Sequence, residues 1–224
     1  MLKENMCQPR ASIHSATLRN LSLAIALSLC TGAEAHAAAD PTYAGKPFSG
    51  APISIPGTVQ AEDYDISPAA VNNVTFHYDG RIGTSEVRTT PDSIGLARFG
   101  AGHVSTTGEK QDPVGAYVGW TQTGEWWKYS LTVKQAGTYF VGGHFAAGGK
   151  GAQISFSFDS GATTGPLDIP TTAGFQPGVE VYHVWESLDK LATVSLPAGP
   201  VVMTVKIEKN AGLNLDYFTL AAAP

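Results

Sequence analysis

Cysteine is nearly absent from this sequence. Of its 224 residues only Cys7 and Cys30 carry a thiol, and both fall within the first 37 residues, which have the pattern of a leader that export removes. The part that would remain has no disulfide, no zinc site built on cysteine and no thiolate nucleophile. Disulfide scaffolds and cysteine catalysis are therefore excluded for that part.

Hydrophobic runs are short. The apolar run Leu21–Leu29 cannot cross a bilayer as a helix. Three basic residues precede it, and small-residue sites ending at Ala35 and Ala37 follow it, which is typical of a secretory signal peptide. We therefore expect residues 1–37 to be a signal peptide, the protein to be secreted or periplasmic, and no segment to insert into a membrane. Lipidation of Cys30 is disfavoured, because a leucine stands where a small residue is expected.

Charged residues are few, and acidic residues slightly outnumber basic ones. The full chain has 14 basic and 19 acidic residues, a net charge of −5. Without residues 1–37 it keeps 11 basic and 17 acidic residues, a net charge of −6. This balance argues against a nucleic-acid partner and against binding to anionic membrane surfaces.

Beyond the leader, the sequence lacks any convincing amphipathic helix. Residues 38–52, rich in Pro, Gly and Ala, are expected to be a linker. Short β-like runs separated by Gly, Pro, Asn and Asp fill residues 53–221. Alternation such as Ile154, Phe156 and Phe158 against serines predicts strands with one buried and one wet face, as in an antiparallel sandwich.

Two adjacent tryptophans raise a local conflict. In "EWWKYSLTV", alternation places Trp127 with Tyr129 on one face and Trp126 with Lys128 on the other. Trp126 then packs on a second layer, is turned by a bulge, or lies exposed on a sugar-facing surface. Packing is favoured, because large aromatic side chains usually dominate cores.

One carboxylate lies near each end of the β pattern. Glu62 closes an early strand in "TVQAEDYD", and Asp216 lies in the last one, "AGLNLDYFTL". Aspartate is depleted in strands and costly to bury as a charge. Spacing alone favours two solvated strand-end residues, although oxygen ligands without His or Cys would suit a hard cation.

Several motifs in order resemble carbohydrate-binding modules of family 6. They are "TVQAEDYD", "YVGWTQTGEWWKYSLTVKQAGTYFVGGHFAA", "GFQ" and "LNLDYF", and they span about Ile53 to Leu220. The resemblance implies an all-β jelly-roll sandwich of two antiparallel sheets, whose first and last strands lie side by side. It also implies a structural calcium at the sheet edge, with Glu62 and Asp216 as ligands and Gln60 as a third.

The same resemblance implies a sugar site in loops at one end of the sandwich. In the family, two aromatic rings clamp a pyranose and an asparagine bonds its hydroxyls. Asn214 matches that asparagine, and Phe175 stands where the family has tryptophan. Val87 stands where the second ring belongs, so Tyr117, Phe99 or His103 is a candidate to replace it.

A second arrangement places the sugar on a sheet face instead. Glu125 and Trp126 are the candidates there, together with Trp185, for which a core position is favoured. The end-loop and sheet-face sites stay open as alternatives.

We therefore expect an exported, monomeric, non-catalytic module that binds a polysaccharide. One alternative is a small jelly-roll hydrolase or lyase, because glycosidic cleavage needs two placed carboxylates and Glu125 and Glu186 are available. The other alternative is a surface or matrix interaction protein without sugar affinity. The histidines have no metal-ligand spacing, which disfavours zinc chemistry.

Overall fold

We describe the protein from a computed structural model. It describes residues 42–67, 73–77, 98–99, 117–119, 121–172 and 183–224, without the side chains of 98–99. The chain divides into two units, Met1–Glu34 and Ala35–Pro224, and every described residue belongs to the second. Among these residues, no helix is long and apolar enough to span a bilayer.

Nearly all described elements are strands. They are β1 (Ile53–Ile55), β2 (Gly57–Gln60), β3 (Phe76–His77), β4 (Arg98–Phe99), β5 (Tyr117–Val118), β6 (Trp126–Val133), β7 (Gly137–Ala147), β8 (Ala152–Phe158), β9 (Thr163–Ile169), β10 (Glu186–Leu196), β11 (Gly199–Lys209) and β12 (Leu213–Ala222). A 3-10 turn, η1 (Ala61–Asp63), follows β2.

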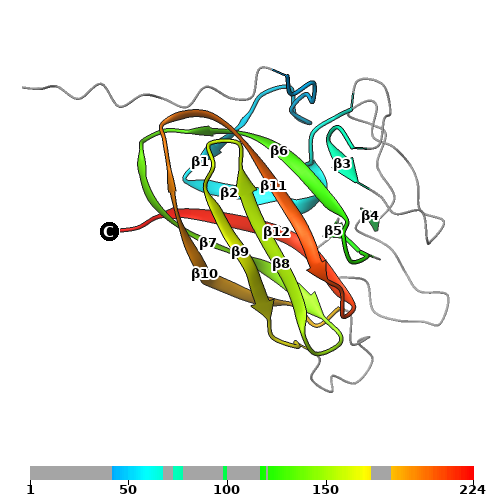
Figure 1. Ribbon diagram of the computed structural model, residues 1–224. Coiled ribbons are helices and arrows are strands. Elements are labelled where there is room, and N and C mark those ends of the chain that lie inside the picture. Colours follow the sequence, from blue (N-terminus) through cyan, green and yellow to red (C-terminus); the bar gives the residue numbers. More distant parts are fainter. Residues whose placement is uncertain (1–41, 68–72, 78–97, 100–116, 120, 173–182) are drawn as a thin grey trace, which may run out of the picture. The chain divides into compact units, whose positions relative to one another are not determined.

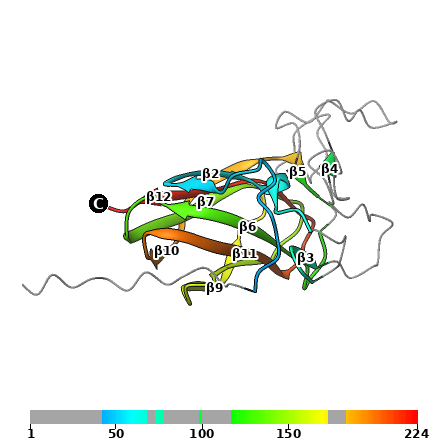
Figure 2. The same cartoon turned by 90° about the horizontal axis from the view of Figure 1, so that it is seen from above.

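The strands form two sheets. The first, here the β11 sheet, has the order β1-β6-β11-β8-β9, with β3 also paired to β6. The second, the β12 sheet, has the order β10-β7-β12-β5-β4, with β2 also paired to β12. Figure 2 shows the two layers, with β2 and β12 in one and β9 and β11 in the other. The predicted all-β sandwich is confirmed, and only the β1–β6 pairing is parallel among the described strands.

Aromatic rings join the two sheets in the core. Phe218 of β12 meets Phe156 of β8 at 5.3 Å between ring centroids, and Tyr129 of β6 at 5.8 Å, both edge-to-face. All three residues are fully buried. Burying one such side chain contributes about 1.5–3 kcal/mol, so this contact between the layers stabilises the sandwich.

Trp126 and Trp127 point to opposite faces of β6. Trp127 is buried in the core, whereas Trp126 is half-buried on the outer face. The β6–β11 register runs without a shift, so no bulge turns Trp126 inward. The His77 ring of β3 stacks on the indole at 6.1 Å between centroids. Trp126 therefore packs in an outer layer, outside the core.

The first part of the described chain contacts the last strand. Gln60 of β2 is paired with Tyr217 of β12, and Figure 1 shows the two strands side by side. The expected adjacency of early and late strands is therefore confirmed. In the pairing of β12 with β7, the register shifts between Leu215 and Tyr217, which makes Asp216 the extra residue of a bulge.

Residues 42–52 lie within the segment expected as a linker, and they make tertiary contacts. Lys46 forms a β-bridge with Ile66. The Tyr43 hydroxyl donates a hydrogen bond to Asp65 at 2.7 Å. These contacts fix the segment, here called the N-terminal strap (residues 42–48), to the chain just after η1, and Tyr43 also lies beside Lys128 of the β11 sheet.

Candidate functional site

The outer side of the β11 sheet is polar and carries one indole. Register places Trp126 of β6 opposite Lys206 of β11. Residues opposite one another on paired strands point to the same face, so two rows of side chains that run across β6, β11 and β8 line one surface. This surface, here called the Trp126 face, comprises Trp126, Lys128, Ser155, Ser157, Thr204 and Lys206.

At one end of the Trp126 face, the positive charge of Lys206 is paired with the carboxylate of Glu208. Lys206 Nζ lies 2.8 Å from Glu208 Oε2, and the Ser155 hydroxyl donates to Glu208 Oε1 at 2.6 Å. The hydrogen bond from Lys206, followed by that from Ser155, lowers the pKa of Glu208. Glu208 is therefore an ionised acceptor at neutral pH.

The other cation of this face lies between aromatic rings. Lys128 Nζ is 5.4 Å from the Trp126 ring centroid and 5.2 Å from that of Tyr43. Within the described part of the chain, no carboxylate forms an ion pair with Lys128. Each ring contributes roughly 0.5–1 kcal/mol to holding an exposed ammonium. Lys128 is therefore held in place by the two rings.

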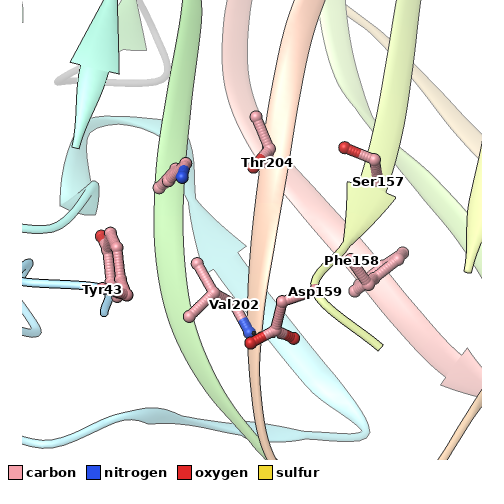
Figure 3. A pocket seen from close by; sticks show the side chains of 7 residues that line it. Tyr43, Ser157, Phe158, Asp159, Val202 and Thr204 are labelled. Atoms are coloured by element: carbon pink, nitrogen blue, oxygen red, sulfur yellow. Dashed lines mark hydrogen bonds between the residues drawn. The ribbon is translucent and has the colours of Figure 1, made fainter. Parts of the chain in front are cut away.

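A pocket of about 170 Å³ opens between the N-terminal strap and the β11 sheet. Figure 3 shows Tyr43 and Asp159 on opposite sides of it, with Val202 between them. Its lining residues are Tyr43, Lys128, Ser157, Phe158, Asp159, Val202 and Thr204. An aromatic ring, hydroxyls and charges of both signs thus meet in one small volume.

Buried Asp65 fixes the Tyr43 wall of this pocket. Its Oδ2 accepts hydrogen bonds from the Tyr43 hydroxyl at 2.7 Å and the Ser130 hydroxyl at 2.6 Å. Its Oδ1 accepts from the Ser130 N–H at 3.0 Å. Burial, followed by the Asp65 charge, raises the pKa of Tyr43 well above its ordinary range. Tyr43 therefore remains a donor, and its ring is held in one orientation.

A second cluster lies on the outer side of the β12 sheet. Tyr117 meets Trp185 at 5.2 Å between centroids, and its hydroxyl lies 3.1 Å from His183 Nε2. His144 lies 5.6 Å from Trp185 and stacks on Tyr217 at 5.2 Å. We call these five residues the ring cluster. Tyr117 is only 2% exposed, so its ring is covered by neighbours.

Asn214 lies beside this cluster and is 7% exposed. Its position is tied to that of Gly119: a Cβ at Gly119 would lie 3.0 Å from Asn214 Oδ1 and 2.7 Å from Tyr117 Cε2. The close approach leaves no room for a side chain at Gly119. Asn214 and Tyr117, both candidate sugar contacts, are thus brought together by the structure.

Glu125 is buried in the turn before β6, at 4% exposure. Its Oε2 accepts the backbone N–H of Gln122 at 2.8 Å. Gly124, with φ of +96°, shapes the same turn. In this structure the Glu125 carboxylate closes a turn beside Trp126, which itself faces outward.

The expected calcium ligands come from adjacent backbones. Gln60 ends β2, Glu62 lies in η1 with a buried Oε2, and Asp216 lies on β12 at 5% exposure. His144 Nδ1 lies 2.6 Å from Asp216 Oδ2. Two carboxylates and an amide are hard oxygen donors, so this set fits calcium if backbone carbonyls complete the shell. Over the described ranges, no three His, Cys, Asp or Glu residues group as a metal site.

Some candidate residues lie outside the described residues. Phe175 and Val87 are among them, so the end-loop clamp stays a prediction. Sequence reasoning missed His77 as the ring that stacks on Trp126, Tyr43 as a second ring beside Lys128, and His144 as the partner of Asp216. The one local signal was the presence of two aromatic residues, Tyr43 and Phe48, in a stretch otherwise rich in Pro, Gly and Ala.

The fold and this face define a β-sandwich whose polar sheet surface bears one indole. A search with family models matched carbohydrate binding module (family 6) over residues 98–222. The chain belongs to carbohydrate-binding module family 6. The strap and β1 to β3 precede the matched residues.

Among solved structures, the chain is similar to a carbohydrate binding module from Cellvibrio mixtus lichenase 5A in complex with cellotriose. Identity is 21% and the TM-score 0.47, over 75% of this chain and 98% of that one. It is also similar to a β-1,3-glucan binding module of Bacillus halodurans, at 16% identity and TM-score 0.46, over 77% and 100%. A Clostridium stercorarium module in complex with cellobiose has 15% identity and TM-score 0.47, over 78% and 99%. No curated protein matched.

Proposed function

We propose that this protein is an exported, non-catalytic module that binds a polysaccharide reversibly on the Trp126 face. The observation that carries the proposal is the outward position of Trp126 among hydroxyl and ammonium groups. The apolar C–H face of a pyranose can lie on an indole, while polar groups at its rim bond the hydroxyls. Family membership supports a carbohydrate ligand.

The charges around this face favour binding over cleavage. Glycosidic hydrolysis needs one carboxyl that keeps its proton and one that is ionised. Hydrogen bonds lower the pKa of Glu208, so it has no proton to donate at neutral pH. Asp159 Oδ1 accepts the Val202 N–H at 2.9 Å. Glu208 and Asp159 are therefore suited to accepting hydrogen bonds from sugar hydroxyls.

A structural calcium belongs to the same proposal. Gln60, Glu62 and Asp216 would hold it where β2 and η1 meet β12. When bound, the ion would neutralise two carboxylates and tie the start of the domain to its last strand. The ligands lie away from Trp126, on the other sheet, so this role is stability rather than recognition.

A second contact region for the same ligand is the end-loop site of the family. Asn214 supports it, and Tyr117, which is 2% exposed, packs behind Asn214 and offers no free ring face to a sugar. Phe175 would supply its stacking ring. The Trp126 face and this region lie on the outer sides of different sheets, so each would bind its own stretch of polysaccharide.

Affinity electrophoresis against glucans, xylans, galactans and uronate polymers, followed by calorimetry on the best ligand, tests this function. We expect one class to bind, and Trp126→Ala to weaken binding at least tenfold, as for a buried aromatic anchor. Thr132→Ala, on the same face of β6, is the control that should bind as before. Turnover of the ligand into new reducing ends, or unchanged binding by Trp126→Ala, would contradict the proposal.

A further inference from the structure

We infer that the pocket under the N-terminal strap is a subsite for an uncharged sugar ring, and that Tyr43 is its stacking wall. The inference rests on the proposed function and adds a contact from outside the family match, which starts at residue 98. The pocket adjoins the Trp126 face, because Lys128 Nζ lies near the rings of both Tyr43 and Trp126. A glycan lying on Trp126 would therefore reach it along the same surface.

Tyr43 is preorganised for this role. Asp65 holds its hydroxyl, and Ser130 donates twice to the same carboxylate, so the ring does not need to be ordered by the ligand. A wall that is already fixed loses little conformational entropy on binding. The strap backbone supports it, since Lys46 and Ile66 exchange two backbone hydrogen bonds, at 3.1 and 2.7 Å.

The charge pattern selects the kind of sugar. Lys128 and Asp159 line opposite sides of the pocket, on β6 and just after β8, with β11 between them. Two strand spacings separate their backbones by roughly 10 Å. A uronate or sulfated ring would gain from Lys128 and lose to Asp159, so an acidic group brings no net advantage.

Hydroxyl groups complete the match to a neutral ring. Ser157 and Thr204 lie opposite each other on β8 and β11, and both line the pocket. Lys128 can donate to a sugar oxygen, and Asp159 can accept from a sugar hydroxyl. Figure 3 shows Ser157 and Asp159 on one side of this space and Tyr43 on the other.

The experiment uses the full exported chain and matched neutral and uronate oligosaccharides, titrated by calorimetry at low salt. Tyr43→Ala should weaken neutral binding about tenfold, and Tyr43→Phe by less, because the ring remains. Asp159→Asn should raise uronate affinity several-fold, and Lys128→Met should lower it. Lys46→Ala, with an exposed strap side chain, is the control and should bind like the wild type.

The outcomes separate the two proposals. If the wild type binds no glycan, the proposed function fails and the inference falls with it. If the wild type binds and Trp126→Ala loses binding, but Tyr43→Ala, Tyr43→Phe and Lys128→Met all bind normally, only the inference is wrong. A wild-type preference of more than tenfold for uronates would also overturn it. If Tyr43→Ala does not fold, the binding affinities of Tyr43→Phe, Asp159→Asn and Lys128→Met still test the inference.

Discussion

Oδ2 of Asp216 lies 2.6 Å from Nδ1 of His144, across the paired strands β12 and β7. A bulge makes this possible, because Asp216 is the extra residue between Leu215 and Tyr217 in the register with β7. His144 also stacks on Tyr217 and contacts Trp185. One backbone irregularity thus links an expected calcium ligand to the ring cluster.

Calcium should stabilise the protein. At a calcium concentration about a hundred times its Kd, binding to the folded state alone adds about 2.7 kcal/mol, and a domain of this size should then melt roughly 5–10 °C higher. Differential scanning calorimetry with calcium and with chelator measures this. Glu62→Gln should abolish the response, whereas Asp189→Asn, an exposed carboxylate elsewhere, should keep it. An identical melting temperature under all conditions would refute the site.

His144→Ala should destabilise the domain by about 1–3 kcal/mol, because it removes a hydrogen-bond partner from a carboxylate that is 5% exposed. Urea unfolding followed by tryptophan fluorescence gives the free energy. Lys150→Ala, in the exposed turn after β7, is the control and should stay within about 0.5 kcal/mol of the wild type. Equal stability of the two variants would show that the pair contributes nothing.

Glu208 should make the stability depend on acid pH. Its pKa is lowered in the folded state by Lys206 and then by Ser155, so the folded protein binds that proton less readily than the unfolded chain. The stability it contributes is present above the unfolded-state pKa and is lost as pH falls through the folded-state pKa. Glu208→Gln should flatten this part of the pH–stability curve. Unchanged curves from pH 2 to 6 would contradict the assignment.

The hydrogen bonds that Tyr43 and Ser130 donate to Asp65 should be energetically coupled. Tyr43→Phe and Ser130→Ala each remove a donor to buried Asp65, and each should cost about 1 kcal/mol. Because both donors bond the same oxygen, the double variant should differ from the sum of the single ones. A double-mutant cycle from urea unfolding measures the coupling. Strict additivity would mean that the two bonds act independently.

Gly119→Ala should destabilise the domain by about 1–3 kcal/mol, since the new Cβ would overlap Tyr117 and crowd Asn214. Gly137→Ala is the matched control, because nothing lies within 4 Å of a Cβ built there. Thermal melting compares the two. If glycan binding depends on the end-loop region, Gly119→Ala should also weaken it, and Gly137→Ala should not.

The sequence by itself determined the architecture, because alternation is a local property. Its period placed Trp127 and Tyr129 inside and Trp126 with Lys128 outside, as the structure has them. The family resemblance rested on short motifs in order, and it correctly predicted that Gln60 and the last strand would be neighbours. These expectations needed only side-chain chemistry and chain order.

Only the tertiary structure decided what surrounds Trp126 and Asp216. Tyr43 reaches Asp65 across 22 residues, and His144 reaches Asp216 across 72, in each case through strand register and packing. No local pattern encodes such pairings, since the register of distant strands and the position of a bulge follow from how the whole core closes. The strap therefore resembled a linker in sequence, although it forms one wall of a pocket in the folded protein.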